Sequence, residues 1–463
     1  MPAQAPVAYA TLSSALPSKP YILGITPATI TPHLLLRHPS TEITIADNQT
    51  LQPVDVLRGG HTGHISSVRA DEGSIWSAGK EGAIVRWDER TRTPGLNIKA
   101  FVRKPLPVLA LAVSERDNLV IGGTELVSSE AHILFWDTRN AKQPMYSHTS
   151  THSDDLTHLS LLPSTSSFLS GSSSNPLPSR LLLSTSTDGL VALSNPQESD
   201  EEEAVLAAEN WGQSIADAGA YAHKGKMKVW ARSDMDGVAT WDIGKGEEDE
   251  LQLQDFMENG TEVYRGKTFA HSPRGPAVVR SAEEEREDKA GVFHSEYLID
   301  VVPSLGVTKR GIPTIGLGSN AGDILLVHQT HHEQALNPSA FFLSGPGHAR
   351  GHKDVVRAMY HDIANEAIYT GSEDGVLSGW SLASLPNRLV VGDPDIDDDG
   401  GDGREDVESE DESEESEIET EESEMDVDDD EEEEERGHRS GPILGRGVED
   451  RKERRRQKRT NPY

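Results

Sequence analysis

The sequence contains no cysteine among its 463 residues. Disulfides, thiolate zinc sites, iron–sulfur clusters and cysteine nucleophiles are therefore excluded. The GxxxxGK[ST], HExxH and GxSxG patterns, which mark phosphate-binding loops, zinc proteases and serine hydrolases, are also absent. We therefore expect no cofactor, no bound metal and no enzymatic activity.

Long apolar runs are missing as well. A membrane-spanning helix needs about 20 consecutive apolar residues, and the sequence has no such run. Residues 1–20 lack the charged segment and apolar core that mark a signal peptide. We expect no membrane association, and the default compartment is the cytosol or the nucleus.

Hydrophobic residues make up only 35% of the sequence, and its formal net charge is −35. Most of this charge lies in residues 393–435, where 28 of 43 residues are Asp or Glu and one is Arg. Such a segment cannot bury enough apolar surface to offset its chain entropy, so we expect a disordered acidic tail over residues 391–435. Residues 1–392 carry a net charge of only −15. The acidity of the whole chain disfavours direct binding to nucleic acid.

Three roles fit the acidic tail. It can act as a solvating segment, as a binding segment for basic proteins such as histones or ribosomal proteins, or as an autoinhibitory partner of the chain's own basic end. Three serines in it have an acidic residue three positions later, which resembles the sites of acidophilic kinases, and phosphorylation would add charge. These candidate phosphosites are Ser409, Ser416 and Ser423.

The last segment, residues 436–463, has the opposite charge, a net +7. A basic cluster of this kind is typical of a nuclear localisation signal or of a nucleic-acid contact. Its only aromatic residue is Tyr463, which disfavours base stacking. We therefore predict nuclear import and a nuclear or nucleolar location, with the cytoplasm as the alternative. The candidate signal residues are Arg451, Lys452, Arg454, Arg455, Arg456, Lys458 and Arg459.

Two segments of the remaining chain have the same layout. His61 precedes Trp87 by 26 positions, and His352 precedes Trp380 by 28. Each histidine follows a glycine, and each tryptophan lies five positions after the glycine of an acidic-Gly turn. This layout resembles the WD40 repeat family, in which Gly-His and Trp-Asp recur within roughly 40–45 residues. Repeats of that family form four antiparallel strands each and close radially into a propeller.

Weaker copies complete the repeat. The Trp-equivalent positions are Ala46, Trp87, Trp136, Ser194, Trp241, Val327 and Trp380. The resemblance implies an all-β fold, a seven-bladed WD40 β-propeller over residues 20–390, followed by the disordered acidic and basic C-terminal tail. The 86-residue interval after Trp241 exceeds one blade, so we predict a surface insertion at about 245–290. The N-terminal segment 1–19 is expected to close the last blade, with about residues 6–12 as its outer strand.

A closer likeness is carried by patches such as NWGQSIADAGAY and GHKDVVRAMYHD. These resemble the WD repeat-containing protein 89 family over most of residues 50–380. The resemblance implies a fold and a compartment more than a mechanism.

The polar residues of the two strong repeats form the first candidate site. In the WD40 family a histidine, a strand Ser or Thr, a turn Asp and the tryptophan form a buried hydrogen-bonded tetrad, which implies a structural role here rather than a Ser–His–Asp catalytic triad. One set keeps all four residue types and the other has Glu in place of Asp. The sets are His352, Thr370, Asp374 and Trp380, and His61, Ser77, Glu81 and Trp87.

The second candidate site is a WDxR sequence that ends two consecutive repeats. A similar motif docks the adaptor of cullin-4 ubiquitin ligases in WD40 substrate receptors, and the planar fork of Arg suits such an interface. The alternative is an ordinary surface Arg after a Trp-Asp pair. The candidate residues are Asp88, Arg90, Asp137 and Arg139.

Two functions remain open from the sequence. The first is a non-catalytic scaffold for protein–protein interactions, in ribosome assembly or chromatin-related complexes. The second is a substrate receptor of a cullin-4-type ubiquitin ligase. The expected partners are proteins in both cases, and the WDxR pair distinguishes the two.

Overall fold

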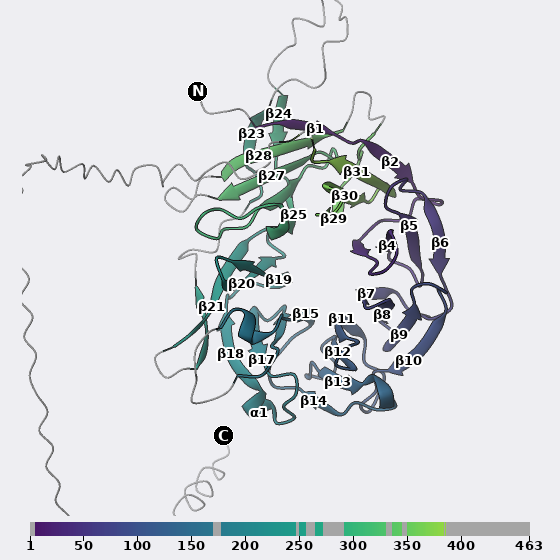
Figure 1. Ribbon diagram of the computed structural model, residues 1–463, viewed down its shortest axis with the longest axis vertical. Coiled ribbons are helices and arrows are strands. Elements are labelled where there is room, and N and C mark those ends of the chain that lie inside the picture. Colours follow the sequence, from purple (N-terminus) through teal and green to yellow (C-terminus); the bar gives the residue numbers. More distant parts are fainter. Residues whose placement is uncertain are drawn as a thin grey trace, which may run out of the picture. The chain divides into compact units, whose positions relative to one another are not determined.

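The computed structural model describes residues 5–169, 177–246, 250–255, 264–271, 291–329, 336–344, 350–383 and 385. Within them, seven sheets of four or five strands follow one another around a common centre (Figure 1). The predicted seven-bladed β-propeller is confirmed. Residues 386–463, which include the expected acidic and basic tail, lie outside the described residues.

The blades are numbered here in chain order. Blade 1 contains β3 (Gly24–Pro27), β4 (His33–Arg37), β5 (Ile43–Asp47) and β6 (Pro53–Leu57). Blade 2 contains β7 (Ile65–Asp71), β8 (Ser74–Gly79), β9 (Ala83–Asp88) and β10 (Pro94–Lys99). Blade 3 contains β11 (Val108–Ser114), β12 (Leu119–Thr124), β13 (Ile133–Asp137) and β14 (Tyr146–His148). Blade 4 contains β15 (Leu156–Leu161), β16 (Leu182–Ser186), β17 (Leu190–Ser194) and β18 (Val205–Asn210).

The other three blades complete the ring. Blade 5 contains β19 (Ile215–His223), β20 (Lys226–Ser233), β21 (Val238–Lys245) and β22 (Leu251–Asp255). Blade 6 contains β25 (Tyr297–Val301), β26 (Ile315–Gly318), β27 (Ile324–Gln329), β28 (Leu336–Leu343) and β1 (Val7–Tyr9). Blade 7 contains β29 (Val356–Asp362), β30 (Ala367–Ser372), β31 (Val376–Ser381) and β2 (Leu12–Ala15). A separate hairpin joins β23 (Thr268–His271) to β24 (Gly291–His294).

Helical structure in the described residues is short. It comprises α1 (Glu201–Ala204) and the 3-10 turns Thr138–Asn140, Thr165–Ser167 and Pro303–Leu305. None of these helices is long and apolar enough to cross a membrane.

Burial follows the position of a strand within its blade. The second strand β8 is buried at all six positions, since neighbouring blades cover both of its faces, whereas the outer strand β10 is mostly exposed. All seven Trp-equivalent positions lie in the third strand of a blade, so the predicted repeats locate the third strand correctly in every blade. The first strands β3, β7, β11, β15 and β19 each contact the next, β20 contacts β25, β25 contacts β29, and β29 contacts β3, which closes the ring.

The closing strand differs from the one expected at residues 6–12. Val7–Tyr9 pairs in parallel with β28 and extends blade 6, with Val7 opposite Phe341. The chain then passes to blade 7, where Leu12–Ala15 pairs antiparallel with β31 as the outer strand. Val7 and Tyr9 pack against the core shared by blades 5 and 6, which explains why this segment stays with blade 6.

The insertion expected at about 245–290 is not entirely an insertion. Its residues 251–255 are β22, the outer strand of blade 5, and Leu251 and Leu253 are buried in the core of that blade. Farther along, Tyr264 is fully buried, and its hydroxyl donates a hydrogen bond to Gln329 Oε1 at 2.9 Å. The charged composition of this region therefore gave no sign of the strand β22 or of the buried Tyr264.

Candidate functional site

The structure brings the four polar residues of blade 2 into one buried set. His61 precedes β7, Ser77 lies in β8, Glu81 in the turn that follows, and Trp87 in β9. The imidazole contacts Glu81 Oε1 through Nδ1 at 2.6 Å and Ser77 Oγ through Nε2 at 2.7 Å. The indole N–H of Trp87 donates to the same Ser77 Oγ at 2.8 Å. Burial lowers the pKa of His61, although the neighbouring Glu81 opposes this shift.

Blade 7 repeats this arrangement with one looser contact. His352 Nε2 lies 2.7 Å from Thr370 Oγ1, to which the indole N–H of Trp380 donates at 2.8 Å. The distance from His352 Nδ1 to Asp374 Oδ1 is 3.7 Å, an ion-pair distance too long for a hydrogen bond. Burial alone would raise the pKa of Asp374, but His352 and nearby backbone amides lower it.

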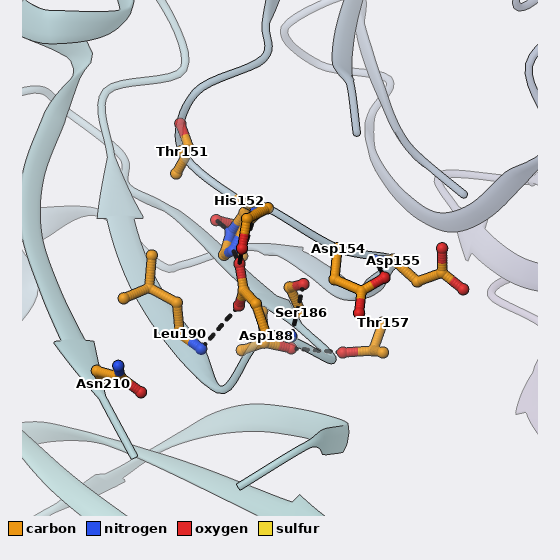
Figure 2. Close-up of polar contacts among 12 residues, drawn as sticks. Thr151, His152, Asp154, Asp155, Thr157, Ser186, Asp188, Leu190 and Asn210 are labelled. Carbon is orange, nitrogen blue, oxygen red and sulfur yellow. Dashed lines mark hydrogen bonds and ion pairs between the residues drawn. The ribbon is translucent and has the colours of Figure 1, made fainter. Parts of the chain in front are cut away.

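A third set in blade 4 was missed in the sequence (Figure 2). His152 Nε2 lies 2.9 Å from Ser184 Oγ, and its Nδ1 lies 3.6 Å from Asp188 Oδ2. The Asp188 carboxylate also accepts hydrogen bonds from the amides of Leu190 at 2.9 Å and Ser153 at 2.7 Å. Burial would raise the pKa of Asp188, but these contacts lower it to about 2.

Two departures hid the third histidine. Thr151 takes the place of the glycine before the histidine, and the Ser/Pro-rich loop widens the His-to-Ser interval to 32 positions. The segment is held instead by Glu201, whose carboxylate accepts hydrogen bonds from the amides of Thr149, Ser150 and Thr151 at 2.6–2.8 Å. The spacing of four residues from Ser184 to Asp188, which matches the other two sets, was the available signal.

The third strand of blade 3 shows why a tryptophan alone does not make a tetrad. Trp136 is fully buried, but its indole N–H has no hydrogen-bond partner among the described residues. The register position that holds Ser77 in blade 2 is Gly122 in blade 3, and a Cβ there would lie 3.1 Å from the Trp136 ring. The glycine accommodates the ring and removes the hydroxyl that would accept its N–H.

These sets are unsuited to nucleophilic catalysis. Ser77 and Thr370 are both 0% exposed, and each hydroxyl is engaged by a histidine and a tryptophan inside its blade. A nucleophile must reach its substrate. The geometry therefore supports a structural role, in which each set ties the loop before a blade to the second and third strands of that blade.

The WDxR sequences end the third strands of blades 2 and 3, and their arginines lie in the turns that lead to the fourth strands. Because strand direction alternates in the same order in blades 2 and 3, these two turns lie on the same face of the propeller. Arg90 is exposed, and its backbone N–H donates to Asp88 Oδ1 at 3.0 Å. Arg139 is 72% exposed, and its Nε and Nη2 donate hydrogen bonds to the Asp137 carboxylate, with Nη2 2.5 Å from Oδ2. Hydrogen bonds from Arg139 lower the pKa of the Asp137 carboxyl to about 2.

The third residue of the blade 2 motif has a role that the sequence did not reveal. Glu89 is 3% exposed, and its carboxylate accepts hydrogen bonds from the amides of Thr29 and Ile30, both at 2.9 Å. The hydroxyls of Thr29 and Thr31 donate to it at 2.8 and 2.7 Å. Blade 2 is thereby fastened to the first turn of blade 1, and Arg90 follows directly after a fixed residue.

The other candidate residues have no structural description. Ser409, Ser416, Ser423 and the basic cluster 451–459 all lie outside the described residues. No group of three or more His, Asp or Glu side chains that could hold a metal ion occurs in the described part of the chain.

Comparison with known proteins adds two relatives of similar extent. No protein-family model matches the chain. The chain is 23% identical over 342 residues to an uncharacterized WD repeat-containing protein of Schizosaccharomyces pombe, covering 73% of this chain and 88% of the relative. It is 22% identical over 350 residues to an uncharacterized WD repeat-containing protein of Saccharomyces cerevisiae, covering 74% and 75%.

A third similarity is local. Human diphthine methyltransferase is 36% identical over 72 residues, which is 15% of each chain. The repeat spacing, the strand register and the two longer relatives agree, and the chain is a WD repeat-containing protein built as a seven-bladed β-propeller.

Proposed function

We propose that this protein is a non-catalytic scaffold that binds other proteins in the nucleus or nucleolus, within ribosome-assembly or chromatin-related complexes. The observation that carries the proposal is the placement of the chain's Ser, His and Asp groups. The three sets that resemble catalytic constellations are buried in the blades, where they tie strands together. The function then belongs to the surfaces of a rigid ring.

The C-terminal segments supply the proposed partners and compartment. Residues 393–435, with 28 acidic residues, favour encounter with cationic proteins such as histones or ribosomal proteins. The basic residues from Arg451 onward favour nuclear import. Kinship with the WD repeat-containing protein 89 family, carried by the sequence patches noted above, is part of this proposal.

Affinity purification of the full chain beside a chain ending at residue 392 tests the scaffold proposal. Basic proteins should be recovered with the full chain and lost with the shorter one, since the acidic segment attracts them. A matched control keeps the length and replaces the Asp and Glu residues of 393–435 by Asn and Gln. Equal recovery of basic proteins with all three chains would contradict a binding role for the acidic segment.

The second candidate function is that of a substrate receptor of a cullin-4-type ubiquitin ligase. The observation in its favour is that Arg90 and Arg139 are both exposed, on one face of adjacent blades. Asp137 already orients the Arg139 guanidinium, so this side chain would lose less conformational entropy on binding a partner than an unpaired Arg would.

Co-purification with the ligase adaptor tests this second function. If both arginines are central contacts, the double variant Arg90→Ala, Arg139→Ala should co-purify with at least about tenfold less adaptor than the wild type does. Arg58→Ala with Arg103→Ala is the control, because these residues follow the outer strands β6 and β10 and lie toward the opposite face. Adaptor binding by the first double variant at the wild-type level would reject the receptor function.

A further inference from the structure

The centre of the propeller holds a cavity of about 350 Å³. All seven innermost strands contribute to its wall, and side chains from two second strands reach it as well. Its volume lies within the range of small-molecule sites. Four arginines and two aspartates line it, namely Arg37, Arg69, Arg232, Arg357, Asp217 and Asp300.

Arg37 reaches the cavity because of a glycine. It ends β4, directly opposite Gly24 of the innermost strand β3. A Cβ on Gly24 would lie 3.1 Å from Arg37 Nε, so the glycine leaves the space that the arginine side chain occupies. The guanidinium donates a hydrogen bond from Nη2 to a neutral acceptor, the carbonyl of Leu23, at 2.8 Å.

Arg69 is held in the same way by carbonyl groups. Its Nε donates to the carbonyl of Leu111 in blade 3 at 3.1 Å, and its Nη1 donates to the carbonyl of Val68 at 3.3 Å. Within the described residues, neither Arg69 nor Arg37 forms an ion pair with a carboxylate. Burial lowers the pKa of Arg37, and the charge of Arg69 adds to this effect against the opposing charge of Asp217.

The nearest partners of the two carboxylates of the cavity are His158 and Arg232. Asp217 Oδ1 lies 2.8 Å from His158 Nδ1, and its Oδ2 lies 3.8 Å from Arg232. Asp300 lies 4.0 Å from the same Arg232. Burial, reinforced by Asp217 and opposed by Arg232, raises the pKa of Asp300 to about 7, so this carboxyl is partly neutral at neutral pH. Positive charge is therefore in excess around Arg37 and Arg69.

We propose that the central cavity binds a phosphate group, free or carried by a small phosphomonoester, through the guanidinium groups of Arg37 and Arg69. Arg37 and Arg69 are half-buried and face the cavity without a carboxylate partner, so an oxyanion there would compensate their charge. Planar guanidinium forks match the oxygen spacing of phosphate. The site uses none of the residues of the scaffold proposal, so its failure would leave that proposal standing.

Calorimetric titration of the full chain with inorganic phosphate, and separately with glycerol 3-phosphate, tests this site. Chloride is used to hold the ionic strength constant. Saturable binding below about 10 mM is expected for inorganic phosphate. Arg69→Ala and Arg37→Ala should each weaken it by about tenfold or more, since each removes a charged hydrogen-bond partner. Glycerol 3-phosphate binding in addition would assign the site to phosphomonoesters, and its failure to bind would assign the site to the free ion.

Two further variants separate binding from folding. Gly24→Ala removes no charge but takes the space of the Arg37 side chain, and it should weaken phosphate binding severalfold. Arg58→Ala removes an arginine that is 66% exposed and paired with Glu42, and it should leave phosphate binding unchanged. Phosphate should raise the melting temperature of the wild type and not that of Arg69→Ala. An equal loss in Arg58→Ala, or no saturable phosphate binding by the wild type, would overturn the proposal.

Discussion

The hydroxyls of Ser77 and Thr370 each lie between an imidazole and an indole. When the histidine Nδ1–H faces the turn carboxylate, Nε2 is an acceptor, so the hydroxyl donates to it and accepts the indole N–H. One small group thereby satisfies two larger ones that are 0–6% exposed. Hydrogen bonds of this kind fix the register of the second and third strands, because a shifted register would leave a buried imidazole or indole N–H without its hydrogen-bond partner.

Asp374→Ala should lower the free energy of unfolding by about 2–3 kcal/mol, because several contacts of one carboxylate are lost together and buried His352 loses its charged neighbour. The carboxylate accepts the amides of Lys353 and Val376, both at 2.9 Å, and it faces His352. Chemical denaturation followed by circular dichroism would measure this change. Glu209→Ala, on the exposed face of β18, is the control and should change stability by less than about 0.5 kcal/mol. An Asp374→Ala chain as stable as the wild type would contradict the role assigned to this set.

At the scale of elements, the ring is closed by two short strands from the N-terminus. Leu12–Ala15 covers the edge of β31, and Val7–Tyr9 covers the edge of β28. Side-chain contacts reinforce the closure, with Ser13 Oγ 2.9 Å from Ser378 Oγ and Arg350 Nη1 donating to the carbonyl of Thr11 at 2.8 Å. A closed ring leaves fewer exposed strand edges for association with other chains.

Deletion of residues 1–15 should therefore destabilise the propeller and expose the edges of two blades. We expect a loss of at least about 3 kcal/mol and a greater tendency to self-associate, since ladder hydrogen bonds and the buried Ala8 and Ala10 are removed. Thermal denaturation and size-exclusion chromatography would measure both effects. Deletion of residues 1–4 keeps both strands and is the control. Equal melting temperatures for the two deletions would show that the N-terminal strands do not stabilise the ring.

The sequence was most informative where spacing is local. The third strand of every blade could be placed from a Trp-equivalent position, which in blades 2, 4, 5 and 7 follows an acidic-Gly turn, because these features lie within one hairpin. The exact closing strand could not, since Val7–Tyr9 and Leu12–Ala15 pair with strands more than 320 residues away. Likewise β22 was hidden, because an outer strand needs only Leu251 and Leu253 to be apolar and the residues around it are charged.

At the scale of the whole molecule, the central cavity had no sequence signal. Its wall is assembled from all seven innermost strands, and no motif connects Arg37 with Arg69 along the chain. The net charge of −35 also proved to describe three different parts, since residues 1–392 carry −15, residues 393–435 carry −27 and residues 436–463 carry +7. A ring with rigid surfaces joined to a highly charged segment is suited to holding several partners at once.

The most direct test of this scaffold account is quantitative mass spectrometry of proteins that co-purify with the full chain and with a chain ending at residue 392. A scaffold of this kind should have two groups of partners. Basic proteins should fall at least about tenfold on removal of the tail, because electrostatic attraction to it is lost. Partners of the propeller surface should be retained by the shorter, still folded chain. Two chains that both purify without any specific partner, under conditions where each is folded, would contradict the account.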